Sequence, residues 1–356
     1  MSTCRYCKAV WPVVSSARSL RIASTTNSTI QRRASSVGKP GQLRHYAVPR
    51  LQRTGPSPLE VYKLSEIPQS SLEAVISRNP EAFQRHTPEE YYKCAEKFHE
   101  AISRGSDPWS ITLTGKTGFP VEVIHETACI MRQIRGPRSA DAFATALWAS
   151  ASEAGYRPSI LSLARHLARS GAYGRVAQLR KVEARFKQLV STARDPDALT
   201  VEGELQYEQG NYEAAIRALQ RALQVGAAGF EWKPYCQLCM GKAFVKTSRH
   251  DEARAIFESL SEIGLIEADI ELGKLLRVSD RDAAERHLFT AASNGRADMF
   301  SLLSEIALEK AAESGDDKTF VNCRRLDKYE YEDDDSCCHH LPSFESMLWD
   351  IRDAWD

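Results

Sequence analysis

Cysteine and histidine residues are the clearest candidates for chemistry in this 356-residue sequence. Cys236 and Cys239 form a Cys-x-x-Cys pair, and the run Cys337-Cys338-His339-His340 would complete a four-ligand set of the kind that holds zinc. The first pair falls on a predicted helix, at positions where small apolar side chains pack, so we expect buried thiols there. We predict no metal and no cofactor, while the spacing alone leaves a zinc or redox role for these cysteines open.

Two further motifs resemble parts of known catalytic sites. Gly115-Lys116-Thr117 resembles the end of a phosphate-binding loop, but Ser110 stands where the loop needs its leading glycine. His125-Glu126 resembles the start of a zinc-protease helix, but the second histidine is missing. No Ser-His-Asp or Cys-His set can be recognised from the spacing. We therefore predict that the protein is not an enzyme.

The N-terminal segment has a composition of its own. Residues 1–59 contain eight Arg and two Lys but no Asp or Glu, and a modest apolar stripe lies beside Arg18 and Arg21. This composition is typical of a mitochondrial transit peptide, and Arg44-His45-Tyr46 resembles a matrix-processing signal. We expect residues 1–46 to be a disordered transit peptide and 47–69 a linker, which predicts a location in the matrix or on the matrix face of the inner membrane. A basic, disordered terminus of a cytosolic protein is the alternative.

The rest of the chain is acidic. The whole sequence has 47 basic and 47 acidic residues, so removing the ten basic residues of 1–59 leaves a net charge of −10. This sign argues against broad electrostatic capture of nucleic acid or anionic lipid, since both require clustered positive charge. No apolar run approaches the roughly 18 residues of a membrane span. We expect no transmembrane segment and at most peripheral contact with the inner membrane.

Two sequence markers recur in phase and indicate repeated helical hairpins. The first is a small or apolar residue followed four positions later by Gly, as in Leu260…Gly264, and the second is a small residue on a predicted opening helix. Glycine after the last helical turn can end a helix, and a small residue allows two helices to cross closely. The first marker ends at Gly155, Ala193 (a degenerate copy), Gly226, Gly264 and Gly295, and the second lies at Ala164, Gly203, Gly241, Gly273 and Ser304.

The clearest copy, residues 203–222, resembles a tetratricopeptide repeat. Gly203 and Tyr207 match its first helix, Gly210-Asn211-Tyr212 its turn, and Ala215 its second helix. The next copy matches through Gly241, Phe244, Ala253, Phe257 and Leu260, and the copy from Leu272-Gly273 to Gly295 is more similar to a Sel1-like repeat. The resemblance implies an all-α superhelix, a solenoid of tetratricopeptide/Sel1-like hairpins that bury their apolar faces by stacking.

The repeats divide the chain into segments. We predict an irregular N-terminal helical segment at 70–136, in which Thr87-Pro88-Glu89-Glu90 opens a helix, and the repeats at 137–314. An acidic loop should follow at 315–342 and a C-terminal amphipathic capping helix at 343–356. The apolar stripe of that last helix is Phe344, Leu348, Ile351 and Trp355.

The resemblance also implies where a partner would bind. In tetratricopeptide folds the opening helices line a concave groove, and the matching positions carry cations one turn apart on successive helices. Such cations could receive an acidic segment or a C-terminal carboxylate through charge-assisted hydrogen bonds, or could simply be solvated. Self-masking by the acidic residues of 330–335 is a further alternative. The predicted groove residues are Arg165, Arg169, Glu204, Tyr207, Glu208, Lys242, Lys246, Lys274 and Arg277.

These features favour a scaffold that holds a protein client. The layout of the chain is similar to that of fungal tetratricopeptide factors for cytochrome oxidase assembly, which implies a mitochondrial adaptor or assembly factor for an inner-membrane respiratory complex. The alternative is an organellar RNA-binding helical-repeat protein or a factor associated with the mitochondrial ribosome. Such RNA-binding repeats are stricter in length and usually basic, whereas this chain without its leader is acidic.

Overall fold

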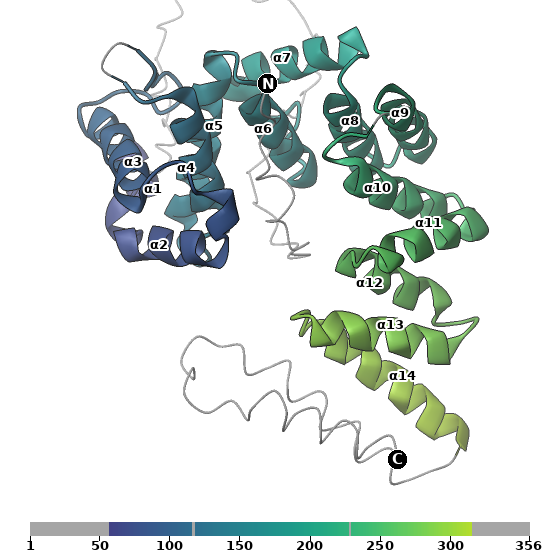
Figure 1. Cartoon of the computed structure of the whole chain (residues 1–356). Helices are drawn as coiled ribbons and strands as arrows, with labels where there is room; N and C mark the ends of the chain where they lie inside the picture. The colour runs from purple at the N-terminus through teal and green to yellow at the C-terminus, as the bar shows by residue number, and fades with distance from the viewer. Residues whose placement is uncertain (1–56, 116–117, 228, 315–356) are drawn as a thin grey trace, which may run out of the picture. The chain divides into compact units, whose positions relative to one another are not determined.

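A computed structural model describes residues 57–115, 118–227 and 229–314, and these ranges are all-helical (Figure 1). They form fourteen α-helices and three short 3-10 helices, with no strand in the described part, which confirms the predicted all-α class. The chain divides between Glu183 and Ala184 into two compact units, which we describe separately. The transit peptide (1–46), the acidic loop (315–342) and the capping helix (343–356) lie outside the described residues and stay predictions.

The first unit is a bundle of helices α1–α6. Helix α4 packs against α3 and α5, and α5 also contacts α6. The bounds are α1 Pro58–Val61, η2 Leu64–Glu66, α2 Gln69–Arg78, η3 Pro80–Ala82, α3 Pro88–Ser103, α4 Val121–Gln133, α5 Arg138–Glu153, α6 Arg157–Arg169 and η4 Ala177–Leu179; α7, Arg180–Thr192, runs across the division between the units.

The start of α3 shows how the sequence sets a helix boundary. The side chain of Thr87 accepts a hydrogen bond from the Glu90 backbone N–H at 3.3 Å, and the Glu90 carboxylate accepts one from the Thr87 N–H at 3.0 Å. This reciprocal pair satisfies two backbone donors that the helix leaves without partners. Pro88 follows at the first helical position, where its missing N–H costs nothing. The predicted helix start is therefore confirmed.

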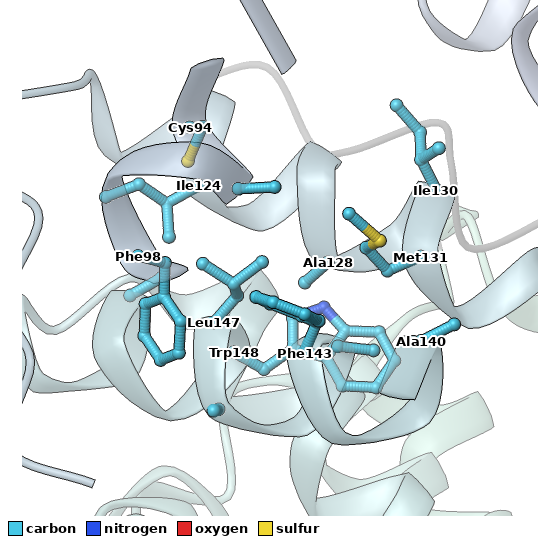
Figure 2. Packing of buried hydrophobic residues seen from close by; sticks show 14 of the residues in the cluster. Cys94, Phe98, Ile124, Ala128, Ile130, Met131, Ala140, Phe143, Leu147 and Trp148 are labelled. Atoms are coloured by element: carbon cyan, nitrogen blue, oxygen red, sulfur yellow. The ribbon is translucent and has the colours of Figure 1, made fainter. Parts of the chain in front are cut away.

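The core of the first unit lies between α3, α4 and α5 (Figure 2). Phe98 of α3, Ile124 of α4, and Phe143, Leu147 and Trp148 of α5 are all fully buried. Burying a side chain of this size stabilises the fold by roughly 1.5–3 kcal/mol. Because α4 and α5 share this core, the predicted boundary at 136/137 is not where the compact units divide. Helices α5 and α6 belong with the N-terminal helices, and the division falls at 183/184.

Residues 57–69 are not a simple linker, in contrast to the prediction. Within this range α1 and η2 form, and Tyr62, Leu64 and Ile67 are buried. The ring of Tyr62 packs edge-on against Phe143 at 5.4 Å and tilted against Phe98 at 6.0 Å. Elements of three or four residues are too short to show a helical period. Reciprocal hydrogen bonds between Ser57 and Glu60 set α1, whereas burial of Leu64 and Ile67 sets η2.

The second unit is a succession of antiparallel helical hairpins. Helix α8 pairs with α9, α10 with α11, and α12 with α13, while α14 packs on α13. The opening helices are neighbours too, because α10 contacts both α8 and α12. The packing defines a solenoid of paired helices, as predicted. The bounds are α8 Pro196–Glu208, α9 Tyr212–Val225, α10 Lys233–Lys246, α11 His250–Glu262, α12 Ile266–Leu276, α13 Arg281–Ser293 and α14 Met299–Ser314.

Glycines mark the helix crossings, as the second sequence marker predicts. A Cβ atom on Gly241 would lie 2.5 Å from the ring of Phe257, which is fully buried on α11. Built Cβ atoms on Gly203 and Gly273 would likewise come within 2.4 Å of Leu219 and 2.5 Å of Leu288. Each opening helix therefore meets a large apolar side chain of its closing helix at a residue without a side chain. Ala215 and Ala253 are fully buried as well, as is Phe257, and Ala164 of α6 is 1% exposed.

The first marker is confirmed at all its positions but one. The residues that end α5, α7, α11 and α13 have a positive φ, including Ala193 at 51° and Gly295 at 88°. Gly226 is the exception, with a φ of −89°. A Cβ atom there would lie 2.2 Å from the ring of Phe230, so close packing and not the left-handed conformation requires glycine at this turn. The left-handed residue of this turn is Gly229, with a φ of 101°.

Candidate partner-binding surface

The predicted groove residues are divided between the two compact units, so no single site is described for all of them. Arg165 and Arg169 lie on α6 of the first unit, and the other seven lie on α8, α10 and α12 of the second. Arg165 is only 4% exposed, because α6 is covered on most of its sides. It therefore does not present a surface charge to a partner in this structure. The candidate partner-binding surface is therefore restricted to the second unit.

Glu204 is also buried, at 3% exposure, although the repeat position predicts a groove residue. It follows Gly203 on α8, and the hydroxyl of Tyr235 on α10 donates a hydrogen bond to its carboxylate. A buried charge requires such partners, so Glu204 ties two opening helices together and does not face a client. Glu208, one turn farther along α8, is exposed.

Tyr207 lies between these two residues and is partly buried. Burial, followed by the negative charge of Glu271 on α12, raises the pKa of its phenol to about 12. Tyr207 therefore stays protonated and can donate a hydrogen bond. The Tyr235–Glu204 contact joins α10 to α8, and the Lys242–Glu271 contact joins α10 to α12, so the three helices share one face, which we call the opening-helix face.

The centre of the opening-helix face is a cluster of lysines around one carboxylate. The ammonium of Lys242 on α10 lies 3.3 Å from Glu271, and that of Lys274 lies 3.8 Å from the same residue. Lys246 is exposed one turn beyond Lys242 and forms no ion pair with a described residue. The lysine cluster, which we define as Lys242, Lys246, Lys274 and Glu271, therefore carries a net charge of +2.

Arg277, predicted as a groove cation, is instead paired within the molecule. Its guanidinium lies 2.8 Å from Glu305 and 2.6 Å from Glu309, both on α14. Hydrogen bonds with Glu309 and Glu305 raise the pKa of Arg277, and the same contact with Arg277 lowers the pKa of Glu309. Arg277 thus acts as a clasp between α12 and α14. The sequence analysis missed Glu305 and Glu309, whose four-residue spacing places both on one helix face.

The predicted chemical motifs have structural roles where they are described. Cys236 and Cys239 are buried on α10, the Cys236 thiol donates to the Leu219 carbonyl oxygen at 3.5 Å, and burial raises the pKa of Cys236 to about 12. Such a thiol is a poor nucleophile and a poor metal ligand. In the described ranges, no group of three or more Cys, His, Asp or Glu residues is arranged to hold a metal ion. Residues 116, 117 and 337–340 lie outside those ranges.

His125 and Glu126 on α4 are core residues. Their contacts are interhelical, because His125 Nδ1 lies 2.8 Å from Ser159 Oγ on α6 and the Tyr91 hydroxyl donates to Glu126 at 2.6 Å. Burial lowers the pKa of His125 to about 3. His125, as a neutral imidazole, and Glu126, as a hydrogen-bonded carboxyl group, therefore both have structural roles in the core. None of the described helices is long and apolar enough to cross a membrane.

Comparisons with known proteins give similar solved structures. No family model and no curated protein matches the sequence. The crystal structure of a Sel1 repeat protein from Oxalobacter formigenes is similar over 67% of this chain and 97% of that chain, with 17% sequence identity and a TM-score of 0.40. The solenoid described above rests on the packing of this chain's own helices.

Proposed function

We propose that this protein is a mitochondrial helical-repeat adaptor that holds a client protein on the opening-helix face of its second unit. The lysine cluster is the observation that carries the proposal. Two ammonium groups share one carboxylate there and a third, on Lys246, lies one turn away, whereas the neighbouring cation Arg277 already has two acidic partners. The cluster can therefore accept another carboxylate by charge-assisted hydrogen bonds.

The client is proposed to contribute an acidic segment. Exposed ion pairs are worth only about 0–1 kcal/mol each, so the lysines set orientation and association rate while other contacts supply most of the affinity. Tyr207, a hydrogen-bond donor beside the cluster, adds an amphipathic contact of the kind that binding surfaces favour. By its layout, the protein would act during assembly of an inner-membrane respiratory complex of the cytochrome oxidase type.

Charge reversal tests the surface. In intact mitochondria, Lys242→Glu with Lys246→Glu should reduce crosslinks to the client, identified by mass spectrometry, at least tenfold. Arg217→Glu with Arg221→Glu is the matched control, because it reverses two exposed cations one turn apart on the closing helix α9. Equal loss in both variants, or no loss in the first, would contradict the proposed surface. Release of the crosslinked complex by nuclease would instead indicate an RNA-binding protein.

The location requires its own test. Residues 1–50 fused to a fluorescent reporter should direct it to mitochondria, because the acid-free, arginine-rich segment is drawn towards the negative matrix. Replacing Arg18 and Arg21 by Gln in the fusion should reduce import. A cytosolic reporter would remove the mitochondrial part of the proposal and leave the binding surface unaffected.

A further inference from the structure

A pocket of about 410 Å³ lies between α11, α12 and α13 of the second unit. It is separate from the lysine cluster, because the two share no residue. Its size is sufficient for a small ligand. Its lining residues are Ser261 on α11, Gly264 in the α11–α12 connection, Ile266 and Asp269 on α12, and Arg286, His287, Thr290 and Asn294 on and just after α13.

Asp269 forms the polar floor of this pocket and is 3% exposed. One of its carboxylate oxygens, Oδ1, accepts a hydrogen bond from Ser261 Oγ at 2.6 Å and another from His287 Nδ1 at 2.8 Å. A carboxylate oxygen accepts hydrogen bonds, so His287 Nδ1 is the donor in this contact, and the uncharged ring that fits it is the tautomer with its proton on Nδ1. The other ring nitrogen, Nε2, then has a free lone pair. The His287 side chain lines the pocket and is 29% exposed, so a ligand in the pocket can reach the ring.

Arg286 supplies the complementary charge. Its guanidinium is exposed and forms no hydrogen bond or ion pair with any residue of the described ranges. The two other polar residues of α13 and its end are engaged locally: Thr290 Oγ1 donates to the Arg286 carbonyl oxygen at 2.9 Å, and Asn294 Nδ2 donates to the Thr290 carbonyl oxygen at 2.8 Å. The pocket therefore offers one cationic donor at Arg286 and an acceptor at His287.

These two polar groups favour one class of ligand. A carboxylate suits the planar fork of Arg286, and an N–H or O–H on the neighbouring carbon suits His287 Nε2. A phosphate dianion would add a second negative charge near Asp269 and offer no donor to Nε2. An apolar substituent would contact Ile266. We propose that the pocket binds a carboxylic acid with a hydrogen-bond donor on its α-carbon, either as a small acid or as the terminal residue of a polypeptide.

Three closely related probes separate the two polar contacts. N-acetyl-leucine has both the carboxylate and the adjacent N–H, 4-methylpentanoate lacks the N–H, and N-acetyl-leucinamide lacks the carboxylate. Saturation-transfer NMR with the full chain should show saturable binding of N-acetyl-leucine and at least tenfold weaker binding of each of the others. No saturable binding of N-acetyl-leucine, or equal binding of all three probes, would overturn the proposal.

Two further measurements connect the binding to these residues. Arg286→Gln should weaken N-acetyl-leucine binding about tenfold to a hundredfold, the loss expected for a charge-assisted hydrogen bond. Arg254→Gln, which removes an exposed arginine of α11 outside the pocket, should leave it unchanged. Imidazole ¹⁵N spectra should show His287 protonated on Nδ1 before the ligand is added. The opposite tautomer, or equal effects of the two arginine variants, would contradict the proposal.

A peptide arm distinguishes the source of the ligand. An eight-residue peptide ending in leucine with a free carboxylate should bind like N-acetyl-leucine or more tightly if polypeptide ends fit the pocket. If N-acetyl-leucine binds and the peptide does not, the site is restricted to small acids, and the proposed binding of polypeptide ends is contradicted. None of these experiments involves the client or the lysine cluster, so their failure would leave the proposed function untouched.

Discussion

At the scale of single residues, Gly241 allows α10 and α11 to pack closely because it has no side chain. The ring of Phe257 occupies the space a Cβ atom would need, and it is fully buried and cannot swing away. Overpacking of this kind costs about 1–3 kcal/mol, which outweighs the gain of about 1 kcal/mol in helix propensity. We predict that Gly241→Ala destabilises this hairpin by up to about 2 kcal/mol, measured by hydrogen exchange of α10 and α11.

A second substitution provides the control. In the Phe257→Leu background the ring is gone, so Gly241→Ala should be neutral or stabilising. If Gly241→Ala were equally harmful in both backgrounds, its effect would not come from the collision with Phe257.

One fully buried histidine, His125, and one partly buried histidine, His166, give the first unit a dependence on pH. Burial lowers the pKa of His125 to about 3, and burial together with the charges of Arg132 and Arg169 lowers that of His166 to about 4. The unfolded chain binds these protons near pH 6.5, so the stability from both groups is complete above 6.5 and is lost as pH falls towards 4 and 3. Each group contributes on the order of 3 kcal/mol.

We therefore predict faster hydrogen exchange in α4 and α6 at pH 5 than at pH 7, after correction for the intrinsic rates. His125→Gln should reduce this difference in α4, because glutamine does not titrate. The exposed residue His250, changed to Gln in the same way, is the control. An unchanged pH dependence in His125→Gln would mean that other groups, such as the carboxylates, cause the acid sensitivity.

At the scale of elements, the Arg277 clasp links α14, which packs on α13, to the end of α12. Arg277→Ala would leave Glu305 without its cation and Glu309 with only the longer contact to Arg281, at 3.9 Å. Exposed pairs contribute about 0.2–1 kcal/mol each, so the loss should be about 1 kcal/mol and should shrink in high salt. We predict faster hydrogen exchange confined to α14. Arg254→Ala, which breaks the pair with Glu258 inside α11, should not affect α14.

The sequence predicts the helical hairpins better than it predicts the ion pairs between their charged side chains. Helices α8–α13 each carry local markers, such as Gly203 and Gly241, that report a crossing or an end directly. The ion pairs join residues far apart in the chain, with Arg277 and Glu309 separated by 32 positions. Which cation meets which acid follows only from how the hairpins stack. Lys242, Lys246 and Lys274 lie on the opening helices, while the acidic partners that neutralise Arg277 could not be predicted from the sequence.

At the scale of the whole molecule, each unit has a core of its own. Phe143 and its neighbours on α3–α5 belong to the first, and Phe257 with residues of α8–α14 forms the second. The repeat pattern extends across the division and so predicts one continuous array beginning at 137. The division at 183/184 arises because α5 packs on α4, a helix that lacks the repeat markers.

Because the two units have separate cores, we expect a mutation in one core to destabilise only its own unit. Phe143→Ala and Phe257→Ala each remove a fully buried ring, which typically costs 3–5 kcal/mol. Because each ring contacts only the core of its own unit, Phe143→Ala should speed exchange in α3–α5 and spare α10–α13, and Phe257→Ala should do the reverse. Hydrogen exchange across both units measures this in one experiment, with Arg254→Ala as a surface control that changes neither. If either variant opened both units equally, the chain would unfold as one cooperative body and the division at 183/184 would have no thermodynamic meaning.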